Sequence, residues 1–191
     1  MVPRSDAPTS PALPAVRYPA RAAAAERRSH SSVTTETPTH AELVDILRAA
    51  SRVADHGALR PWRVIEIRGD ARRKLGRSFA KAEHKGGISD KPMRAELLIA
   101  LVTSRKRSSK PDWEQDATAA GVAHMLSLLL DEAGWGVFWR TGDYTRSKAV
   151  RKAHDLKKGE ELLGWLYVGG KKTTSSHPKR PVDVEAFITS M

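Results

Sequence analysis

A continuous apolar run, in the stretch ELLIALVTS at residues 96–104, restricts the possible folds of this chain more than any other feature of its sequence. A strand with one solvated face alternates apolar and polar residues, whereas an unbroken apolar run of strand length is typical of a buried strand. We therefore expect a sheet with this strand in its interior. The 191 residues suit one domain with a substantial core, and no apolar run approaches the ~18 residues of a membrane-spanning helix.

Segments with helical periodicity alternate with further strand-like segments. Thr39 and Glu42 form a capping box that opens the first helix. Asp70 is expected to cap the second helix, and Gly134 to end the third, which is apolar over most of its circumference. Helices are predicted over residues 39–54, 70–85, 111–134 and 145–156, and the other strands over residues 62–68, 135–140 and 161–170. This alternation predicts a single α/β or α+β domain.

The two ends of the chain differ from its centre. Residues 1–26 are rich in proline and alanine without apolar periodicity, which predicts a mobile tail before a domain spanning residues 27–191. The composition of this tail also allows a transit peptide, although we expect a cytoplasmic protein. The last segment, residues 180–191, is amphipathic, and four of its side chains are available for packing: Val182, Val184, Phe187 and Ile188.

The composition excludes several kinds of chemistry. With no cysteine, the chain has no thiol nucleophile, disulfide or Cys-ligated zinc, and its seven histidines show no ligand spacing, so we predict no metal site. The net charge of +11 comes from separate basic stretches without interleaved aromatic residues, which favours a solvated surface over a nucleic-acid groove. No G-x-S-x-G or H-E-x-x-H motif is present, and we predict no catalytic side chain. An enzyme of this kind would take its chemistry from a cofactor.

Five short motifs remain unexplained by packing alone. In chain order they are RRS (27–29), R-x-x-D-H-G…PW (52–62), PDWEQ (111–115), GWGVFWRTG (134–142) and GWLYVGG (164–170). In this order and at these distances the series resembles the flavin-dependent nitroreductase family, in particular its small YdjA-like branch, over residues 26–191. The resemblance implies an α+β fold with a central, mainly antiparallel sheet flanked by helices, in an intertwined homodimer that binds FMN between its subunits.

The resemblance also implies roles for individual residues. The phosphate and ribityl end of FMN would be contacted by Arg27, Arg28 and Ser29, joined by Trp139, Arg140 and Thr141. The pair Arg52 and His56 would face the flavin of the partner subunit. Contact with the nicotinamide cofactor would come from Leu129, Leu130, Asp131, Glu132, Ala133 and Gly134. The residue types agree with this, because a guanidinium offers a phosphate two parallel hydrogen bonds in a plane.

The sequence therefore predicts an NAD(P)H-dependent FMN oxidoreductase. Hydride would pass through flavin N5 to a nitroaromatic, quinone or similar acceptor by a ping-pong mechanism, in a homodimer without membrane or nucleic-acid partners. A non-catalytic protein that stores FMN or senses redox state is the alternative from a different class. The sequence also departs from the family at Arg60, where glutamine is frequent, and in a short stretch between Phe79 and Ala95 that trims one wall of the expected substrate pocket.

Overall fold

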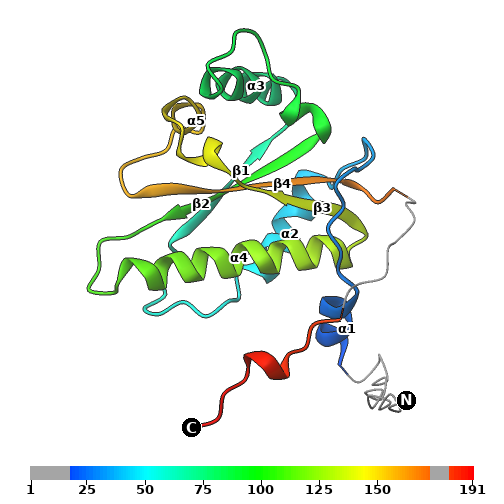
Figure 1. Cartoon of the computed structure of the whole chain (residues 1–191), viewed down its shortest axis with the longest axis vertical. Coiled ribbons are helices and arrows are strands. Elements are labelled where there is room, and N and C mark those ends of the chain that lie inside the picture. Colours follow the sequence, from blue (N-terminus) through cyan, green and yellow to red (C-terminus); the bar gives the residue numbers. More distant parts are fainter. Residues whose placement is uncertain (1–17, 173–180) are drawn as a thin grey trace, which may run out of the picture.

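The computed structural model of the protein describes residues 18–172 and 181–191. Its centre is a four-stranded antiparallel sheet with the strand order β1–β2–β4–β3 (Figure 1). The strands are β1 (Trp62–Ile67), β2 (Leu97–Ser104), β3 (Trp135–Arg140) and β4 (Glu160–Gly170). The helices are α1 (Pro19–Glu26), α2 (His40–Ala50), α3 (Asp70–Ala82), α4 (Asp112–Glu132) and α5 (Lys148–Ala153), with 3-10 helices η1 (Lys91–Arg94), η2 (Asp143–Arg146) and η3 (Glu185–Phe187).

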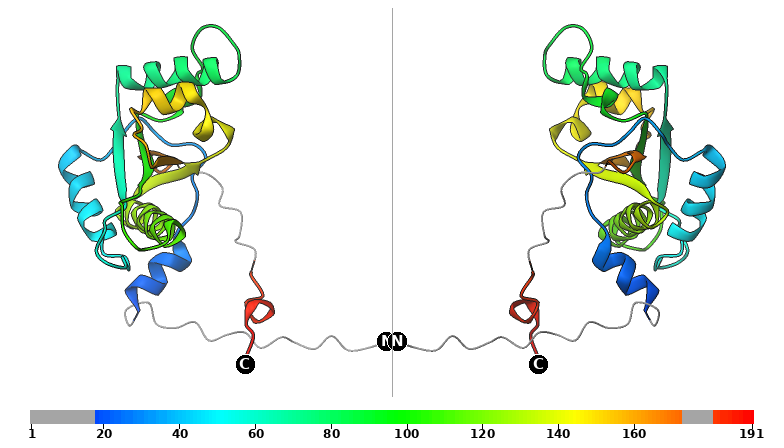
Figure 2. Two further views of the ribbon diagram at one scale, coloured as in Figure 1. Left: turned by 90° about the vertical axis from the view of Figure 1, so that its left-hand side faces the viewer. Right: turned by 90° about the vertical axis from the view of Figure 1, so that its right-hand side faces the viewer.

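Strand β2 lies inside the sheet, between β1 and β4, and all eight of its residues are buried. Helices α3 and α5 cover one face of the sheet, and α2 and α4 cover the other, as the side views in Figure 2 show. An unbroken apolar sequence is what a strand covered on both faces needs. The prediction of a buried strand is confirmed, as is the α+β class with a mainly antiparallel sheet flanked by helices.

The two faces of the sheet have separate apolar layers. Phe79 and Trp165 are almost fully buried between the sheet and α3 and α5, whereas Leu126 and Leu166 are buried on the α2–α4 side. Side chains of successive strand residues point to opposite faces, so each strand contributes to both layers in alternation. This alternation decides which side chains of β3 and β4 can meet at one site.

The start of α2 is fixed as its sequence predicts. The backbone N–H of Glu42 donates to Thr39 Oγ1 over 3.2 Å, and the backbone N–H of Thr39 donates to Glu42 Oε2 over 2.7 Å, which completes the capping box. The prediction for α3 is wrong in detail, because Gly69, with φ of 50°, is the N-cap and Asp70 is the first helical residue. The carboxylate of Asp70 still lies in the first turn, where negative charge stabilises a helix.

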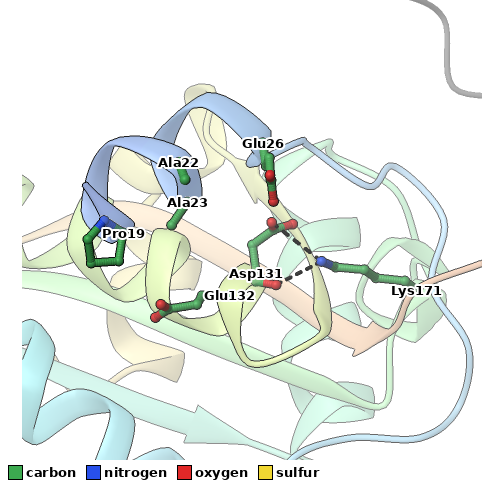
Figure 3. Close-up of a pocket in the computed structure, with 7 residues that line it drawn as sticks. All are labelled: Pro19, Ala22, Ala23, Glu26, Asp131, Glu132 and Lys171. Carbon is green, nitrogen blue, oxygen red and sulfur yellow. Dashed lines mark hydrogen bonds and ion pairs between the residues drawn. The ribbon is translucent and has the colours of Figure 1, made fainter. Parts of the chain in front are cut away.

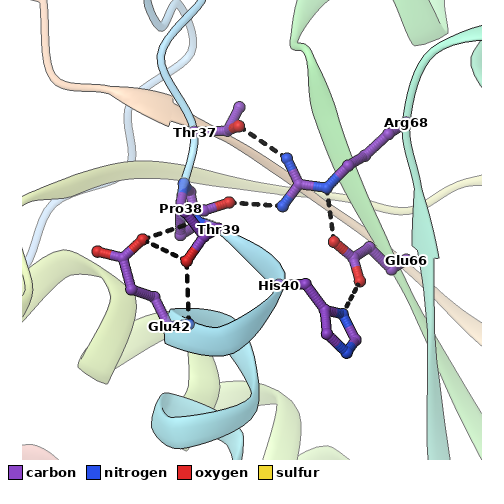
Figure 4. Close-up of polar contacts among 7 residues, drawn as sticks. All are labelled: Thr37, Pro38, Thr39, His40, Glu42, Glu66 and Arg68. Atoms are coloured by element: carbon purple, nitrogen blue, oxygen red, sulfur yellow. Dashed lines mark hydrogen bonds and ion pairs between the residues drawn. The ribbon is translucent and has the colours of Figure 1, made fainter.

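A polar cluster ties the start of α2 to strand β1 (Figure 4). Arg68 donates through Nη1 to Thr37 Oγ1 over 2.7 Å and through Nε to Glu66 Oε1, and Glu66 Oε2 lies 2.7 Å from His40 Nδ1. Partial burial by itself raises the pKa of Glu66, but the hydrogen bonds from His40 and Arg68 outweigh it and the pKa is lowered. These contacts fix the direction in which the chain enters the domain.

Residues 19–26 differ from the expected mobile tail, because they form helix α1 against the C-terminal end of α4. Pro19 is at the first helical position, where its missing N–H removes no hydrogen bond, and four alanines (residues 22–25) have the highest helix propensity. Residues 1–17 of the predicted tail lie outside the described residues. At the other end of the chain, Val182, Phe187 and Ile188 are more than half exposed and do not enter the core.

An irregularity in β4 shapes the end of β3. The pairing of β2 with β4 shifts register between Leu101 and Val102, next to Gly164, whose φ is 133°. A Cβ atom at Gly164 would lie 2.4 Å from the carbonyl oxygen of Arg140. Glycine is therefore required for the close approach of the two strands at the point where β3 ends.

Candidate functional site

A pocket of about 230 Å³ lies at the end of β3, on the face of the sheet that α3 and α5 cover. Its walls come from α3, η1, β4, and β3 with the turn and η2 that follow it. The lining residues are Phe79, Lys91, Arg94, Arg140, Thr141, Tyr144, Trp165 and Tyr167. The pocket thus combines three cationic side chains with four aromatic ones.

Positive charge in this pocket is only partly neutralised. The guanidinium of Arg140 lies 4.6 Å from the ring centroid of Phe138 and 5.2 Å from that of Tyr167, and its buried Nε has no hydrogen-bond partner among the described residues. Arg94 is exposed and has no ion-pair partner within the described part of the chain. A buried N–H of a charged group without an acceptor is costly, which makes the site suited to an anionic ligand.

The third cation, Lys91, is held in place by its neighbours. Its ammonium donates to Glu83 and to the hydroxyl of Tyr144, which itself donates to Glu83. The hydrogen bonds from Lys91, Tyr144 and Lys85 lower the pKa of Glu83 to about 2, and the hydrogen bond to Glu83 raises the pKa of Lys91. Lys91 therefore stays protonated at neutral pH.

The aromatic wall of the pocket is fixed by stacking and hydrogen bonding. The rings of Phe79 and Tyr144 are stacked with centroids 4.6 Å apart, and Trp165 packs edge-on against Phe79 at 5.0 Å. Behind this wall, Trp165 Nε1 donates to His154 Nε2 over 3.0 Å, and His154 Nδ1 lies 2.8 Å from the carbonyl oxygen of Val150. Burial lowers the pKa of His154, so the ring is neutral and donates through Nδ1. A rigid apolar wall results, to which a flat ligand can be apposed.

Tyr167 closes the inner side of the pocket. Burial raises the pKa of its hydroxyl to about 12, although the nearby cations oppose that rise. The phenol therefore remains neutral throughout the physiological pH range and does not neutralise Arg140.

Two of the residues predicted from sequence, Arg140 and Thr141, line this pocket. The segment Arg27–Ser29 does not line it but precedes His30, whose backbone N–H donates to the carbonyl oxygen of Val137 over 2.8 Å. The predicted phosphate-binding segment is therefore attached to the same strand that carries Arg140.

Trp139 lies on the opposite face of the sheet. Its ring packs edge-on against His124 of α4 at 4.9 Å, and its Nε1 donates to the carbonyl oxygen of Leu163 over 3.4 Å. The period-2 geometry of a strand requires this, because Trp139 adjoins Arg140 in β3. The side chain of Trp139 belongs to the α4 layer and does not line the pocket.

The predicted pair Arg52 and His56 lies in the loop between α2 and β1, away from the Arg140 pocket. His56 Nδ1 is 2.7 Å from Glu114 Oε2 in the first turn of α4. A separate hollow of about 360 Å³ adjoins it, lined mainly by apolar surface from Val53, Ala54, His56, Trp113, Glu114, Ala117, Thr118 and Gly121. Within one chain the structure therefore does not bring Arg52 and His56 together with Arg140.

The loop that carries His56 is ordered by Asp55. The carboxylate of Asp55 accepts the backbone N–H groups of Leu59 over 3.1 Å and Arg60 over 2.7 Å. Ala58 and Arg60 have φ values of 50° and 48°, in the left-handed region that non-glycine residues rarely adopt. Such strain persists only where surrounding contacts enforce it, and it is more frequent at functional sites.

The predicted nicotinamide segment, residues 129–134, is the C-terminal end of α4 and the turn after it. Leu130 and Asp131 are buried, whereas Glu132, Ala133 and Gly134 are exposed. A hollow of about 380 Å³ lies between this end of α4 and helix α1 (Figure 3), lined by Pro19, Ala22, Ala23, Glu26, Asp131, Glu132 and Lys171. Three carboxylates and the carbonyl end of a helix make it an electronegative surface with one cation.

Lys91 and Arg94 are pocket residues that the sequence analysis did not identify. They lie on either side of Pro92 in η1, directly before the buried strand β2. Two cations at the entry to a buried strand are a signal that the sequence contains, but their proximity to Arg140 depends on pairing between strands far apart in the chain.

Neither a metal-binding cluster nor a membrane-spanning helix occurs among the described residues. No group of three or more His, Cys, Asp or Glu side chains in residues 18–172 and 181–191 is arranged to hold a metal ion. Among the same residues, no helix is both long and apolar enough to cross a membrane.

The helix-flanked antiparallel sheet, with a cationic and aromatic pocket at the end of an edge strand, defines an α+β ligand-binding domain. The family model described as "Nitroreductase family" matches residues 24–170, and the chain belongs to that family.

The relatives that it resembles are consistent with this assignment. It is 30% identical over 172 residues to "Putative NAD(P)H nitroreductase YdjA" of Escherichia coli K12, a match that covers 85% of this chain and 94% of YdjA. Its structure is similar to a nitroreductase-like family protein from Bacillus cereus, with a TM-score of 0.77, 18% identity and coverage of 96% and 99% of the two chains. A mutant of the FMN- and NADPH-dependent nitroreductase NfnB from Sphigopyxis sp. strain HMH gives a TM-score of 0.73 at 18% identity, with coverage of 93% and 99%. Family membership supports an oxidoreductase role.

Proposed function

We propose that the protein is an NAD(P)H-dependent FMN oxidoreductase that reduces a nitroaromatic, quinone or similar acceptor by a ping-pong mechanism. The observation that carries this proposal is Arg140, which enters an aromatic-lined pocket with a buried Nε and no hydrogen-bond partner among the described residues. A guanidinium left in this condition fits a phosphate, which accepts two parallel hydrogen bonds from it. The names of YdjA and NfnB, which refer to NAD(P)H, and to FMN and NADPH, support the same choice of cofactors.

The residues present fit a flavin mononucleotide. Arg140 and Thr141 would hold its phosphate end, joined by Arg27, Arg28 and Ser29 from the segment that is attached to β3 through His30. Lys91, kept protonated by Glu83, adds positive charge near this end. The stacked rings of Phe79 and Tyr144 exclude water from one side of the pocket. When bound, FMN supplies a two-electron centre that accepts hydride and passes it on at N5.

A homodimer is part of the proposal. Arg52 and His56 lie too far from the pocket of their own chain to line it, so they would complete the site of a partner subunit. Trp113, 69% exposed beside His56, and the exposed apolar side chains Val182, Phe187 and Ile188 are surfaces that a second copy would cover.

For the nicotinamide cofactor, we propose a contact with residues 129–134 that involves its ribose hydroxyls and not its diphosphate. The carboxylates of Asp131 and Glu132 and the carbonyl end of α4 would repel a diphosphate. They would instead accept hydrogen bonds from ribose hydroxyls. A cytoplasmic location and the absence of nucleic-acid partners remain proposals as well.

The test is the absorbance spectrum of the purified protein, followed by anaerobic addition of NADH or NADPH. We expect bound or readily bound FMN that is bleached by one of the two. Arg140→Ala should raise the Kd for FMN about 10- to 100-fold, because a hydrogen bond to a charged group is worth about 1.5–3 kcal/mol. The control is Arg48→Ala, which removes an exposed arginine paired with Asp45 on α2. Failure of the wild type to bind FMN would refute the proposal, and FMN binding without NAD(P)H oxidation would favour the storage or sensing alternative.

A further inference from the structure

We propose that Asp131 is a positioning residue, which holds the segment Arg27–Ser29 in place through His30. This inference rests on the proposed function, because that segment is proposed to contact the cofactor phosphate. It gives the end of α4 a role distinct from nicotinamide binding.

Three parts of the chain meet at Asp131. Its Oδ1 is buried without a hydrogen-bond partner among the described residues and lies 3.3 Å from His30 Nε2, with which it forms an ion pair when the imidazole is protonated. The ammonium of Lys171, just after β4, donates to the backbone carbonyl of Asp131 over 2.7 Å and lies 3.4 Å from its Oδ2, as Figure 3 shows. One residue of α4 thus connects the segment after α1 with the end of β4.

The stability of α4 does not explain a carboxylate at this position. Asp131 is 8% exposed and lies in the last turn of the helix, where the exposed carbonyl groups disfavour negative charge. Burial of a carboxylate is also unfavourable unless charged or hydrogen-bonding partners compensate it. An apolar residue would serve the helix and the core better, so the carboxylate is explained by the groups that it contacts, His30 and Lys171.

The backbone around His30 is fixed independently of this side-chain contact. The N–H of His30 donates to Val137 of β3 over 2.8 Å, and Val33 forms a bridge with Lys171. Paired glycines of β3 and β4 leave the space that the segment occupies. A Cβ atom at Gly136 would lie 3.3 Å from His30 Cβ, and one at Gly169 would lie 2.4 Å from the carbonyl oxygen of Thr34.

The contact with Asp131 therefore adds a side-chain restraint at His30, beside the backbone hydrogen bond from His30 to Val137. Residues 30–34 are held by backbone hydrogen bonds from His30 and Thr34 and by the glycines, and Arg27 is held on the other side by its backbone N–H, which donates to the carbonyl oxygen of Ala23 over 2.9 Å. With the ring of His30 held against Asp131, the chain direction at Ser29 is determined as well. Small displacements of a binding group weaken its contacts strongly, so this restraint affects affinity for the cofactor.

The test uses Asp131→Asn, which removes the charge and preserves the size of the side chain. We expect the Kd for FMN to rise about tenfold. In the flavin-free protein, trypsin should cleave faster after Arg27 and Arg28. Asp112→Asn is the matched control, because it is the same substitution in the same helix, at an exposed site in the first turn without contacts to the segment. It should change neither the FMN Kd nor the cleavage rate.

A second variant tests the route through His30. His30→Ala should reproduce both effects, and the double variant should be no worse than either single variant, because the two residues act through one contact. Additive effects, or an Asp131→Asn protein that matches the Asp112→Asn control, would overturn the proposal. Faster cleavage with an unchanged FMN Kd would overturn it too, since the segment would then be anchored without serving the cofactor. If the wild type binds no FMN, the proposed function fails, and the cleavage assay still decides whether Asp131 anchors the segment.

Discussion

Replacing Glu160 with glutamine should make the protein less stable at neutral pH and should make the loss of stability in acid less steep. The carboxylate is 7% exposed at the start of β4 and accepts two parallel hydrogen bonds from Arg63. Nε of Arg63 donates to Oε1 and Nη2 donates to Oε2, each over 2.7 Å. The backbone N–H of Lys157 donates to it as well, over 2.9 Å. The hydrogen bonds from Arg63, opposed by burial, lower the pKa of Glu160 from 4.5 to about 2.

The size of the effect follows from this pKa. At 1.36 kcal/mol per pH unit, the lowered pKa corresponds to roughly 3 kcal/mol of stabilisation. Arg63 is 35% exposed, so solvent screening reduces the expected loss in Glu160→Gln to about 2 kcal/mol. Because the folded-state pKa lies below the ordinary value, this stabilisation is fully present above pH 4.5 and is lost as the pH falls toward 2. The difference between wild type and variant should shrink by roughly half between pH 6 and pH 3.

The assay is urea unfolding at fixed protein concentration from pH 7 to pH 3, with Glu161→Gln as the matched control. Glu161 is the next residue, 38% exposed, and its contacts to Arg105 and Arg146 are 3.1 and 3.3 Å long. An exposed bridge of this kind is worth up to about 1 kcal/mol. A loss in Glu160→Gln no larger than in the control, or one that is the same at pH 3 as at pH 7, would refute the reasoning.

Three further predictions concern the site and the segments that support it. Mixing a chain altered at Arg52 with one altered at Arg140, under conditions that allow subunit exchange, should restore roughly a quarter of wild-type activity. The reason is that half of the dimers are then mixed, and each mixed dimer contains one intact site. No recovery after confirmed exchange would show that Arg52 acts within its own chain. Gly169→Ala should lower stability by about 2–3 kcal/mol in thermal unfolding, because its Cβ would lie 2.4 Å from the carbonyl oxygen of Thr34, and an unchanged Tm would contradict the close approach. Asp55→Ala should lower the Tm by about 3–8 °C, since it removes the acceptor of two loop N–H groups, and a change below 1 °C would mean that the loop is held by other contacts.

The secondary structure was predictable where the chain makes its own local signals. The capping box at Thr39, the apolar run of β2 and the glycine that follows α4 each act within a few residues, and all three appear in the structure as expected. The α1 helix escaped prediction because its eight residues carry no amphipathic pattern and it is placed by contact with α4. Its alanines and its N-terminal proline favour a helix through their intrinsic propensity, which a pattern of apolar periodicity does not reflect.

The candidate site was predictable only in part, because it depends on strand pairing. The resemblance pointed to Arg140 and Thr141, and the structure places both in the pocket. The same motif includes Trp139, whose side chain lies on the other face, a consequence of strand alternation that a list of motif residues does not express. The place of Lys91 in the pocket and the Trp165–His154 hydrogen bond could not be predicted locally, since each depends on residues from other elements.

The alternation of side chains along β3 and β4 also has a consequence for directed evolution. Phe138 and Arg140 of β3 lie on the pocket side with Trp165 and Tyr167 of β4, while Val137 and Leu166 belong to the layer beneath α4. A mutant library confined to every second position of these two strands would therefore vary ligand preference and leave the α4 layer untouched. A library over the alternate positions would vary the packing beneath α4 at an unchanged pocket surface.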